Sequence, residues 1–208
     1  MNPVDGGTTG GRGRLGSLPV NADFDTVLAA AQRGDSDAFA ALWRMFHPPL
    51  YRYLRVVAAP ICDDAAAETW FQVARHLPSF SGGKEAFQGW LFTIARHRVI
   101  DWKRRLMRRP ETLVGLHVVD SPAIESDPAE IFDEKSATDA ALALIAVLPP
   151  AQAEAVMLRT VAGLSVSMTA KLMNRSPGSV RVLCHRGLRQ LAGTTSNHDT
   201  PEVVGAVS

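Results

Sequence analysis

The side chains between Ser176 and Arg189 have the types and the spacing of a helix that reads double-stranded DNA. Ser176 followed by Pro177 is typical of an N-cap and a first-turn proline, so we expect a helix from here to about Leu191. Hydroxyl, imidazole and guanidinium groups on one face of such a helix can hydrogen-bond to base edges and phosphates in the major groove. The residues expected to face the groove are Ser176, Ser179, Arg181, Val182, His185, Arg186 and Arg189.

Within this set, Arg181 is expected to read a base, and Arg186 and Arg189 to hold phosphates. The apolar residues expected to face inward are Val180, Leu183 and Leu188. The preceding segment completes a helix-turn-helix, because Ser165 is a suitable N-cap for a short first helix and Asn174 stands where the turn needs a positive φ. An ordinary helical hairpin is the alternative interpretation of residues 163–192.

A second candidate nucleic-acid surface lies in the segment from Phe87 to Arg109, which is expected to form one helix. Five cations of this helix are expected to bind phosphates without reading sequence: Arg98, Lys103, Arg104, Arg105 and Arg108. Trp90, near the start of the helix, either stacks on an unpaired base or packs in the core, and the sequence leaves both open. Residues 79–86 form a loop with paired glycines that is expected to be flexible enough to close over an extruded base.

Charge is strongly segregated along the chain, although the formal net charge is only +1. Residues 94–109 carry seven basic side chains and one acidic one, and residues 111–139 carry eight acidic side chains and one basic one. Residues 140–192 carry six Arg or Lys, with Glu154 as the single acid. This order is typical of two nucleic-acid-binding modules joined by a solvated linker.

The hydrophobic pattern predicts the helices that must position these surfaces. An amphipathic helix containing Phe39 and Phe46 is expected to end at Pro48 and Pro49, with a second helix following over residues 50–59. A third helix is expected to start at Asp63 or Asp64, and its predicted apolar face is Ala67, Trp70, Phe71, Ala74 and Leu77. Residues 137–148 and a segment from residue 150 or 151 to residue 163 are expected to form two more helices before the helix-turn-helix.

These elements predict an all-α fold of two small helical domains joined by a flexible acidic linker. The expected divisions are a disordered tail (1–22), a helical domain (23–109), the linker (110–136), a helix-turn-helix domain (137–193) and a second disordered tail (194–208). The sequence has no apolar run long enough to span a membrane and no signal-peptide core, which predicts a cytoplasmic protein without membrane insertion. Cys62 and Cys184 stand alone, so neither a disulfide nor a metal site is expected.

With both modules in view, residues 24–192 resemble the extracytoplasmic-function (ECF) sigma factors of bacterial RNA polymerase. FQGWLFTIARHRVIDWKRRLMRR (87–109) is similar to the family's helix for recognising and melting the minus-ten promoter element, and CDDAAAETWFQVARHLPSF (62–80) to its polymerase clamp-docking helix. LPPAQAEAVMLRTVAGLSV and SPGSVRVLCHRGLRQL are similar to the domain that reads the minus-thirty-five element. The resemblance implies core RNA polymerase, promoter DNA and an anti-sigma factor as partners, and no cofactor, small-molecule substrate or catalytic activity.

The resemblance also implies roles for individual residues. The residues implied to dock on polymerase are Asp63, Asp64, Glu68 and Gln72. The residues implied to contact the minus-ten element are Trp90, His97, Arg98, Asp101, Lys103, Arg104, Arg105 and Arg108, and the groove-facing residues given above are implied to contact the minus-thirty-five element. Positions that depart from the family's common residues are Ala65–Ala67 (commonly Leu-Val-Gln), Ala153 (Arg), Met168 (Glu) and His97 (Asn).

The free energy needed to open DNA indicates that this chain acts together with a large protein partner. Opening about six base pairs costs on the order of 8 kcal/mol at roughly 1.4 kcal/mol per stacked step, whereas one base held by an aromatic side chain returns roughly 1 to 3 kcal/mol. A small helical module therefore cannot hold a bubble open by itself. The main alternative is a DNA-binding regulator with an N-terminal dimerisation or ligand module, and the absence of GxSxG, Walker and HExxH motifs makes an enzyme the weakest of the three hypotheses.

Overall fold

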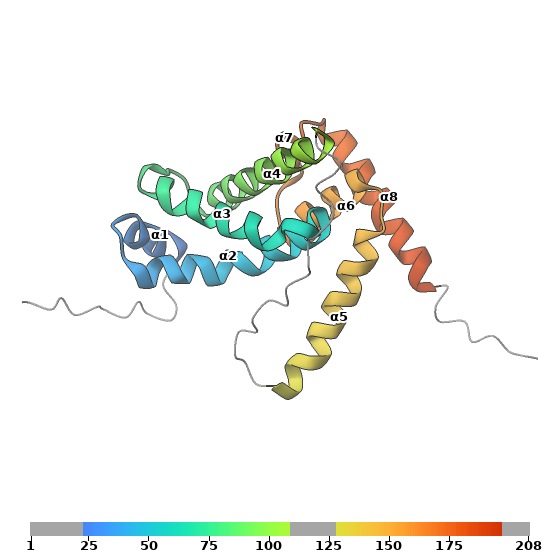
Figure 1. The fold of residues 1–208 in the computed structure, drawn as a ribbon, viewed down its shortest axis with the longest axis horizontal. Helices are drawn as coiled ribbons and strands as arrows, with labels where there is room; N and C mark the ends of the chain where they lie inside the picture. Colours follow the sequence, from blue (N-terminus) through green and yellow to red (C-terminus); the bar gives the residue numbers. More distant parts are fainter. Residues whose placement is uncertain (1–22, 109–127, 197–208) are drawn as a thin grey trace, which may run out of the picture.

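The computed structural model describes residues 23–108 and 128–196, and within these ranges every regular element is a helix (Figure 1). The predicted all-α fold is thereby confirmed. The helices are α1 (Phe24–Gln32), α2 (Ser36–Val57), α3 (Cys62–His76), α4 (Lys84–Arg108), α5 (Pro128–Ala146), α6 (Pro150–Val156), α7 (Val166–Met173) and α8 (Pro177–Ser196). In this part of the chain, no helix combines the length and the apolar character needed to cross a bilayer.

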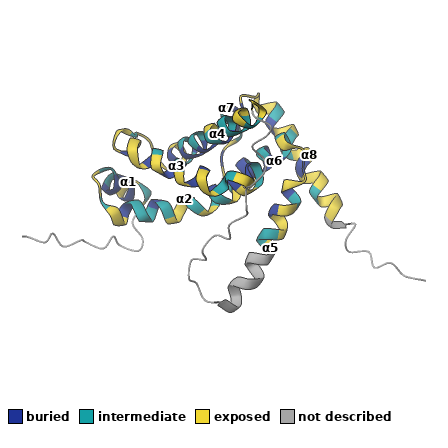
Figure 2. Cartoon of the chain, in the orientation of Figure 1, coloured by how far each residue is buried: buried dark blue, intermediate teal, exposed yellow. Residues whose placement is uncertain are grey.

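The first four helices enclose an aromatic centre, and their buried sides face one another (Figure 2). Phe24, Phe46 and Phe87 come from three different helices and meet with ring centroids 5.0 to 5.9 Å apart. Phe80, from the loop before α4, packs edge-on against Phe87 at 5.6 Å, and Gln32 Nε2 donates to the Phe80 carbonyl at 2.7 Å. Tilted and edge-on ring pairs add specific attraction to the burial of area, so this centre fixes α1, α2 and α4 together with the loop.

α2 runs without interruption through Pro48 and Pro49, so the prediction that this pair ends the helix was wrong. A proline inside a helix lacks the N–H donor and disfavours the helix by about 3 kcal/mol. Against this cost, α2 buries large side chains on both sides of the pair, namely Leu42, Phe46, Leu50, Tyr53 and Leu54. Burying a large apolar side chain stabilises the folded state by about 1.5 to 3 kcal/mol relative to leaving it exposed. Packing therefore outweighs the local preference, and Pro48 itself lies on the exposed side.

α3 buries only part of the predicted face, since Trp70 and the adjoining Leu77 are buried as expected. Its buried residues are Ala65, Ala66, Thr69, Trp70 and Val73, whereas Ala67, Phe71 and Ala74 are exposed. The orientation follows Trp70, whose ring packs edge-on against Phe39 at 5.9 Å and whose Nε1 donates to His47 Nδ1 at 3.2 Å. The neighbouring Phe71, one residue round the helix, is left on the surface with 61% of its area exposed.

The helix-turn-helix forms as predicted. Ser165 caps α7, because its hydroxyl accepts a hydrogen bond from the Met168 amide at 3.2 Å. Asn174 adopts the left-handed conformation, with φ 52° and ψ 53°. Ser176 caps α8 by accepting from the Ser179 amide at 3.1 Å. These three predictions, made from residue type alone, are confirmed.

Two boundaries of the second module differ from expectation. α5 begins at Pro128, inside the segment 110–136 predicted as a linker, and α8 continues to Ser196, into the segment 194–208 predicted as disordered. Before the helix-turn-helix, α6 passes into a π-helical turn (Met157–Val161), and the chain then reverses at Gly163 with φ 66°. The remaining parts of the predicted linker and tails, residues 1–22, 109–127 and 197–208, lie outside the described residues.

The two modules are in direct contact rather than joined only by a tether. Their buried residues form one contiguous core. α2 packs on α5 and α6 as well as on α1, α3 and α4, and α4 lies against α7 (Figure 1). The sequence predicted two separately packed domains, and their mutual contact is a finding of the structure.

We expect Pro48→Ala to raise the free energy of unfolding, by up to about 3 kcal/mol, because alanine restores the missing helical N–H donor at an exposed position. Urea unfolding followed by circular dichroism measures this. Pro150→Ala is the matched control, since Pro150 occupies the first turn of α6, where its N–H has no helical partner to lose. An equal gain from both substitutions would contradict this account of α2.

Burial lowers the pKa of His47 below its ordinary value of 6.5, despite the opposing charge of Asp63. The neutral ring, which accepts from Trp70, is therefore favoured in the folded chain. Since the folded pKa is the lower one, this stability is fully present above about pH 6.5 and is lost as the pH falls toward the folded pKa. We expect the free energy of unfolding of wild type to fall over this range, and His47→Asn, which keeps an acceptor but does not titrate, to show a smaller fall. If the free energy of unfolding falls equally with pH in the two proteins, His47 is not the group responsible.

Candidate nucleic-acid interface

α8 presents the predicted groove-facing residues on one side. Ser176, Arg181, Val182, His185, Arg186 and Arg189 are exposed, and Ser179 is half-buried. The inward stripe differs from expectation, because Leu188 is 49% exposed and Gly187 is buried in its place. A Cβ at position 187 would lie 2.9 Å from Val156 Cγ2, so α6 and α8 pack closely at this glycine. The exposed face of α8 thus keeps its guanidinium groups available to a partner.

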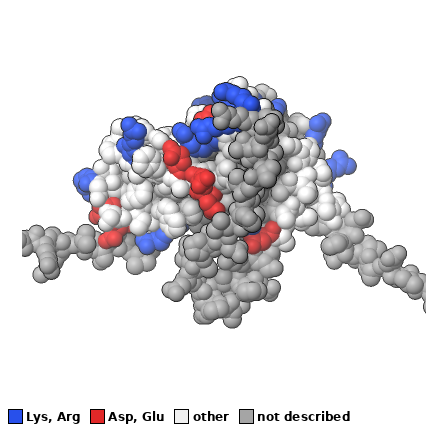
Figure 3. Space-filling view, viewed as in Figure 1, with Lys and Arg blue, Asp and Glu red and all other residues white. Residues whose placement is uncertain are grey.

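The C-terminal end of α4 forms a second cationic surface. Arg104, Arg105 and Arg108 are exposed there, and Lys103 is half-buried. Arg104 lies 3.9 Å from Asp101 in an exposed ion pair, a kind that contributes at most about 1 kcal/mol and yields readily to another anion. Figure 3 shows lysine and arginine side chains gathered at the top of the molecule, over this end of α4. The surface is suited to binding phosphates.

Arg98 is turned toward α3 instead. Its Nη1 lies 4.0 Å from Glu68 Oε1, and its buried Nε has no hydrogen-bond partner among the described residues. Glu68 also accepts from Gln72 Nε2 at 2.9 Å. The structure therefore brings one residue expected to bind DNA into contact with a residue expected to dock on protein.

The exposed face of α3 combines acidic and apolar groups. Asp63 accepts from the Tyr51 hydroxyl at 2.8 Å, and Asp64 is exposed. Asp64 and Glu68 lie seven and three residues before Phe71, so all three share one side of the helix. The exposed Phe71 ring beside two carboxylates makes this face of α3 a candidate surface for a protein partner. The sequence had assigned Phe71 to the core, and the excess of apolar positions around α3 was the signal that one side served another purpose.

The loop before α4 is shorter than predicted, because α4 begins at Lys84 and a 3-10 turn ends at Ser79. Gly82 has φ 140°, and a Cβ there would lie 2.7 Å from Ala86 Cβ. Trp90 stacks on Phe80 with ring centroids 4.9 Å apart and an interplanar angle of 26°. Trp90 is only half-buried, so it both completes the aromatic centre and reaches the surface.

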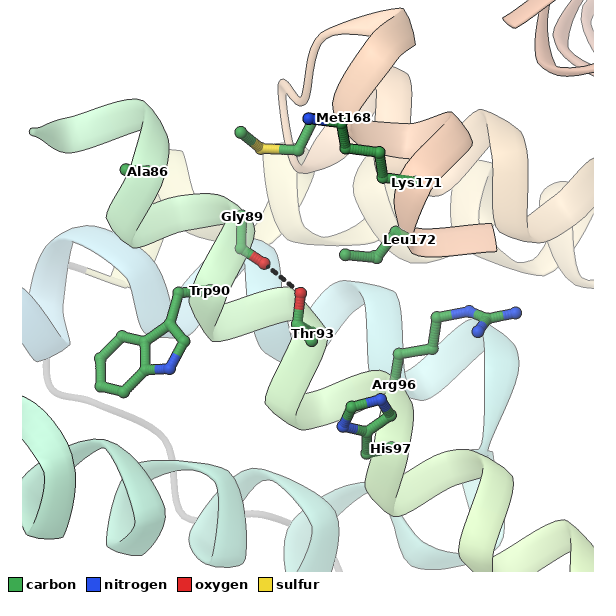
Figure 4. A pocket seen from close by; sticks show the side chains of 9 residues that line it. All are labelled: Ala86, Gly89, Trp90, Thr93, Arg96, His97, Met168, Lys171 and Leu172. Carbon is green, nitrogen blue, oxygen red and sulfur yellow. Dashed lines mark hydrogen bonds between the residues drawn. The ribbon is translucent and has the colours of Figure 1, made fainter. Parts of the chain in front are cut away.

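A cavity of about 490 Å³ lies between α4 and α7 (Figure 4). The residues around it are Ala86, Gly89, Trp90, Thr93, Arg96, His97, Met168, Lys171 and Leu172. His97 is exposed at this edge. Figure 4 shows Gly89 of α4 facing Met168 of α7, with the Thr93 hydroxyl donating to the Gly89 carbonyl at 2.7 Å. Two residues from the expected minus-ten set, Trp90 and His97, therefore border the helix-turn-helix.

Arg96 joins the two modules, a role that the sequence did not reveal. Its Nε donates to Glu154 Oε1 at 2.7 Å, with the two side chains 19% and 20% exposed. The buried Tyr53 hydroxyl donates to the same oxygen at 3.3 Å. Burial and the charge of Glu154 raise the pKa of Tyr53 well above its ordinary value, so the hydroxyl stays protonated. The available signal was Glu154 itself, the single acid of residues 140–192.

Each of the two modules matches a known protein family. The sigma-70 region 2 family matches residues 42–109, and the sigma-70 region 4 family matches residues 138–191. The ECF RNA polymerase sigma factor BldN of Streptomyces coelicolor is 34% identical over 168 residues, which cover 80% of this chain and 63% of BldN. ShbA of Streptomyces griseus, also an ECF RNA polymerase sigma factor, is 33% identical over 186 residues, which cover 81% of this chain and 95% of ShbA.

Among solved structures, the chain is similar to the sigma factor RpoE of Bartonella quintana, which was crystallised with the anti-sigma factor NepR. The TM-score is 0.56 at 20% identity, covering 76% of this chain and 96% of that one, which shows a shared fold. Both sigma-70 regions match here in the order of the two helical modules, and the aligned part of ShbA, 81% of this chain, is one-third identical. The chain therefore belongs to the extracytoplasmic-function (ECF) sigma factors.

Proposed function

We propose that the chain binds core RNA polymerase and directs it to initiate transcription at specific promoters. The observation that carries this proposal is that two cationic helix surfaces, on α4 and α8, stand on different modules of one chain. A simple DNA-binding regulator needs the helix-turn-helix and leaves the basic end of α4 without a purpose. The proposed division assigns polymerase docking and the minus-ten element to residues 23–109, and the minus-thirty-five element to residues 137–193.

Polymerase docking is assigned to the exposed face of α3. Phe71 supplies an apolar anchor, and Asp64 and Glu68 supply charge on the same side. Aromatic residues that are solvent-exposed in a free protein and flanked by polar groups are frequent anchors of protein interfaces. Such a partner is required because opening the DNA strands costs more free energy than the base contacts of one small helical module can supply.

DNA contacts divide by residue type. On α8, Arg181 lies in the second turn, where a recognition helix meets base edges, and Arg186 and Arg189 lie further along, toward the phosphates. On α4, the exposed cations Arg104, Arg105 and Arg108 are assigned to the backbone. Trp90, half-exposed beside the glycine loop, is assigned to the opened strand.

Further parts of the proposal concern regulation and location. An anti-sigma factor is the proposed regulator, as one accompanies RpoE of Bartonella quintana in its crystal structure. We place the site of action in the cytoplasm, where core polymerase and promoters are found. The chain is proposed to act as a specificity subunit without a catalytic reaction of its own.

Run-off transcription with purified core polymerase tests the central claim. A sigma factor converts core enzyme, which initiates without specificity, into one that starts at defined positions. Binding to DNA without any binding to core polymerase would favour the regulator instead. Gel filtration of the chain with core polymerase, run beside the transcription assay, separates these two outcomes.

Arg181→Ala is expected to weaken binding at particular promoter positions by about 1 to 3 kcal/mol, because a guanidinium on a base edge carries sequence information. Arg105→Ala is expected to weaken binding to all promoters alike and to make the dependence on salt less steep, because a phosphate contact carries none. A promoter library transcribed with each variant at two salt concentrations measures both effects. If the two variants lose activity in the same pattern across the library, this division of roles is wrong.

Phe71→Ser is expected to weaken binding to core polymerase by about 2 kcal/mol, roughly 30-fold, because truncating an interface anchor typically costs this much. The thermal midpoint of the free chain should barely change, since Phe71 is 61% exposed. Met45→Ser, at an exposed apolar residue of α2, is the control and should leave polymerase binding unchanged. Fluorescence anisotropy of the labelled chain against core polymerase gives both affinities, and equal losses for both variants would remove Phe71 from the docking surface.

A further inference from the structure

The cavity between α4 and α7 is lined by several groups that can carry positive charge and, within the described part of the chain, by no acidic residue. The cationic groups are Arg96 and His97 of α4 and Lys171 of α7. Its volume of about 490 Å³ lies within the range of small-molecule sites, roughly 300 to 1,000 Å³. The cavity therefore has the size and the charge to hold a small organic anion.

We propose that this cavity binds a free nucleoside phosphate, with the phosphate between Arg96 and Lys171 and the base beside Trp90. Such a ligand has an anionic end and a flat aromatic end, and the cavity offers a complementary group to each. Trp90 and Arg96 are six residues apart on α4, or about 9 Å along the helix at 1.5 Å per residue. This separation is comparable with the distance from base to phosphate in a nucleotide. The inference goes beyond the proposed function, because the ligand is a small diffusible molecule rather than DNA or polymerase.

Arg96 is held in position at the wall of the cavity. Its Nε donates to Glu154 Oε1 at 2.7 Å, which uses one of the five N–H donors of the guanidinium group. Glu154 does not itself line the cavity. Because the bond to Glu154 already orders the arginine side chain, less rotamer entropy is lost when its other donors bind a phosphate. The anchored guanidinium is therefore suited to hold an anion here.

Lys171 supplies the uncompensated charge of the site. Glu154 offsets the charge of Arg96, whereas Lys171 is exposed and has no ion pair with any residue that the structure describes. Figure 4 shows Lys171 of α7 opposite the stretch of α4 between Gly89 and Arg96. An ammonium group on a flexible stem binds phosphate as a point charge. The phosphate site is therefore completed by α7.

The base end of the cavity is aromatic and apolar. Phe80 stacks on the Trp90 ring with centroids 4.9 Å apart, and Trp90 is only half-buried and also lines the cavity. Met168 forms the facing wall, where a Cβ at Gly89 would overlap its Sδ. Indole rings stack on bases, and the polarizable thioether packs favourably against aromatic rings. Because Met168 stands where the family commonly has glutamate, this wall has no carboxylate to repel a phosphate.

Isothermal titration calorimetry of the full-length chain with ADP, without polymerase or DNA, tests the site. We expect a dissociation constant in the micromolar range, as for other ligands of this size. Adenosine, which lacks the phosphates, should bind about 10- to 100-fold more weakly, because hydrogen bonds between charged groups are lost. Pyrophosphate, which lacks the base, should bind at least about fivefold more weakly, because base stacking is lost.

Lys171→Ala is the decisive variant. We expect it to weaken ADP binding about 10- to 100-fold and to leave adenosine binding unchanged, because only the phosphate contact is removed. Lys171→Arg keeps the charge and should retain ADP binding. Lys84→Ala is the matched control, because Lys84 is an exposed lysine of α4 that does not line the cavity. Since both lysines are exposed, all three variants should keep the thermal midpoint of wild type.

Any of three results overturns the nucleotide site: ADP binding no tighter than about 1 mM, equal affinities for ADP and pyrophosphate, or equal ADP binding by wild type and Lys171→Ala. A fluorescein-labelled single-stranded DNA gives a further check, because Lys171→Ala should bind it as wild type does. Equal losses for ADP and for this DNA would make the cavity part of a DNA-binding surface instead.

Run-off transcription by wild type with core polymerase tests the proposed function separately. ADP binding that depends on Lys171, without specific initiation, would remove only the sigma-factor role. Specific initiation without ADP binding would remove only the nucleotide site.

Discussion

The fold depends on the burial of one face of α2. This helix packs on α1, α3 and α4 within its own module and on α5 and α6 of the other, so both modules share it as a common support. Leu42 and Phe46 lie on the near side of the Pro48–Pro49 pair, and Tyr53 and Leu54 lie beyond it. Because the far side carries the contact with the second module, an α2 that ended at the prolines would lose both its own core and the Tyr53 hydroxyl that reaches Glu154.

Sequence reasoning succeeded where one residue type answers one local need. Ser165, Asn174 and Ser176 each satisfy a backbone requirement that lies within three residues, and all three are placed as predicted. It failed where a distant contact decided the outcome. The continuity of α2 depends on its packing against five other helices. The exposure of Phe71 depends on the contacts that Trp70 makes with His47 and Phe39. Periodicity alone shows that a face is apolar, and it does not show whether the chain itself or a partner covers it.

The candidate site shows the same contrast in its charges. In the sequence, Arg96, Arg98 and Arg104 belong to one basic run, and Arg98 and Arg104 were both expected to bind phosphates. In the structure Arg96 binds Glu154, Arg98 faces Glu68, and Arg104 remains on the surface beside Asp101. Helical spacing separates them, since residues 96, 98 and 104 point to three directions around α4. The number of cations in the sequence therefore indicates where the basic surface lies. The ion pairs of each cation determine how many of them are free to bind phosphate.

The contact at Gly187 restricts the rotation of α8 about its own axis. The groove between α6 and α8 closes to contact distance because this position has no side chain, and Val156 and Leu148 fill the space. Residues six positions apart in a helix are separated by about 120° around its axis, so a contact that fixes the position of Gly187 also fixes the direction in which Arg181 points. A larger residue at 187 would force α8 to move or rotate relative to α6, and either change would alter the direction of Arg181. Under the proposed function, the choice of bases is thus coupled to a residue on the side of α8 that packs against α6.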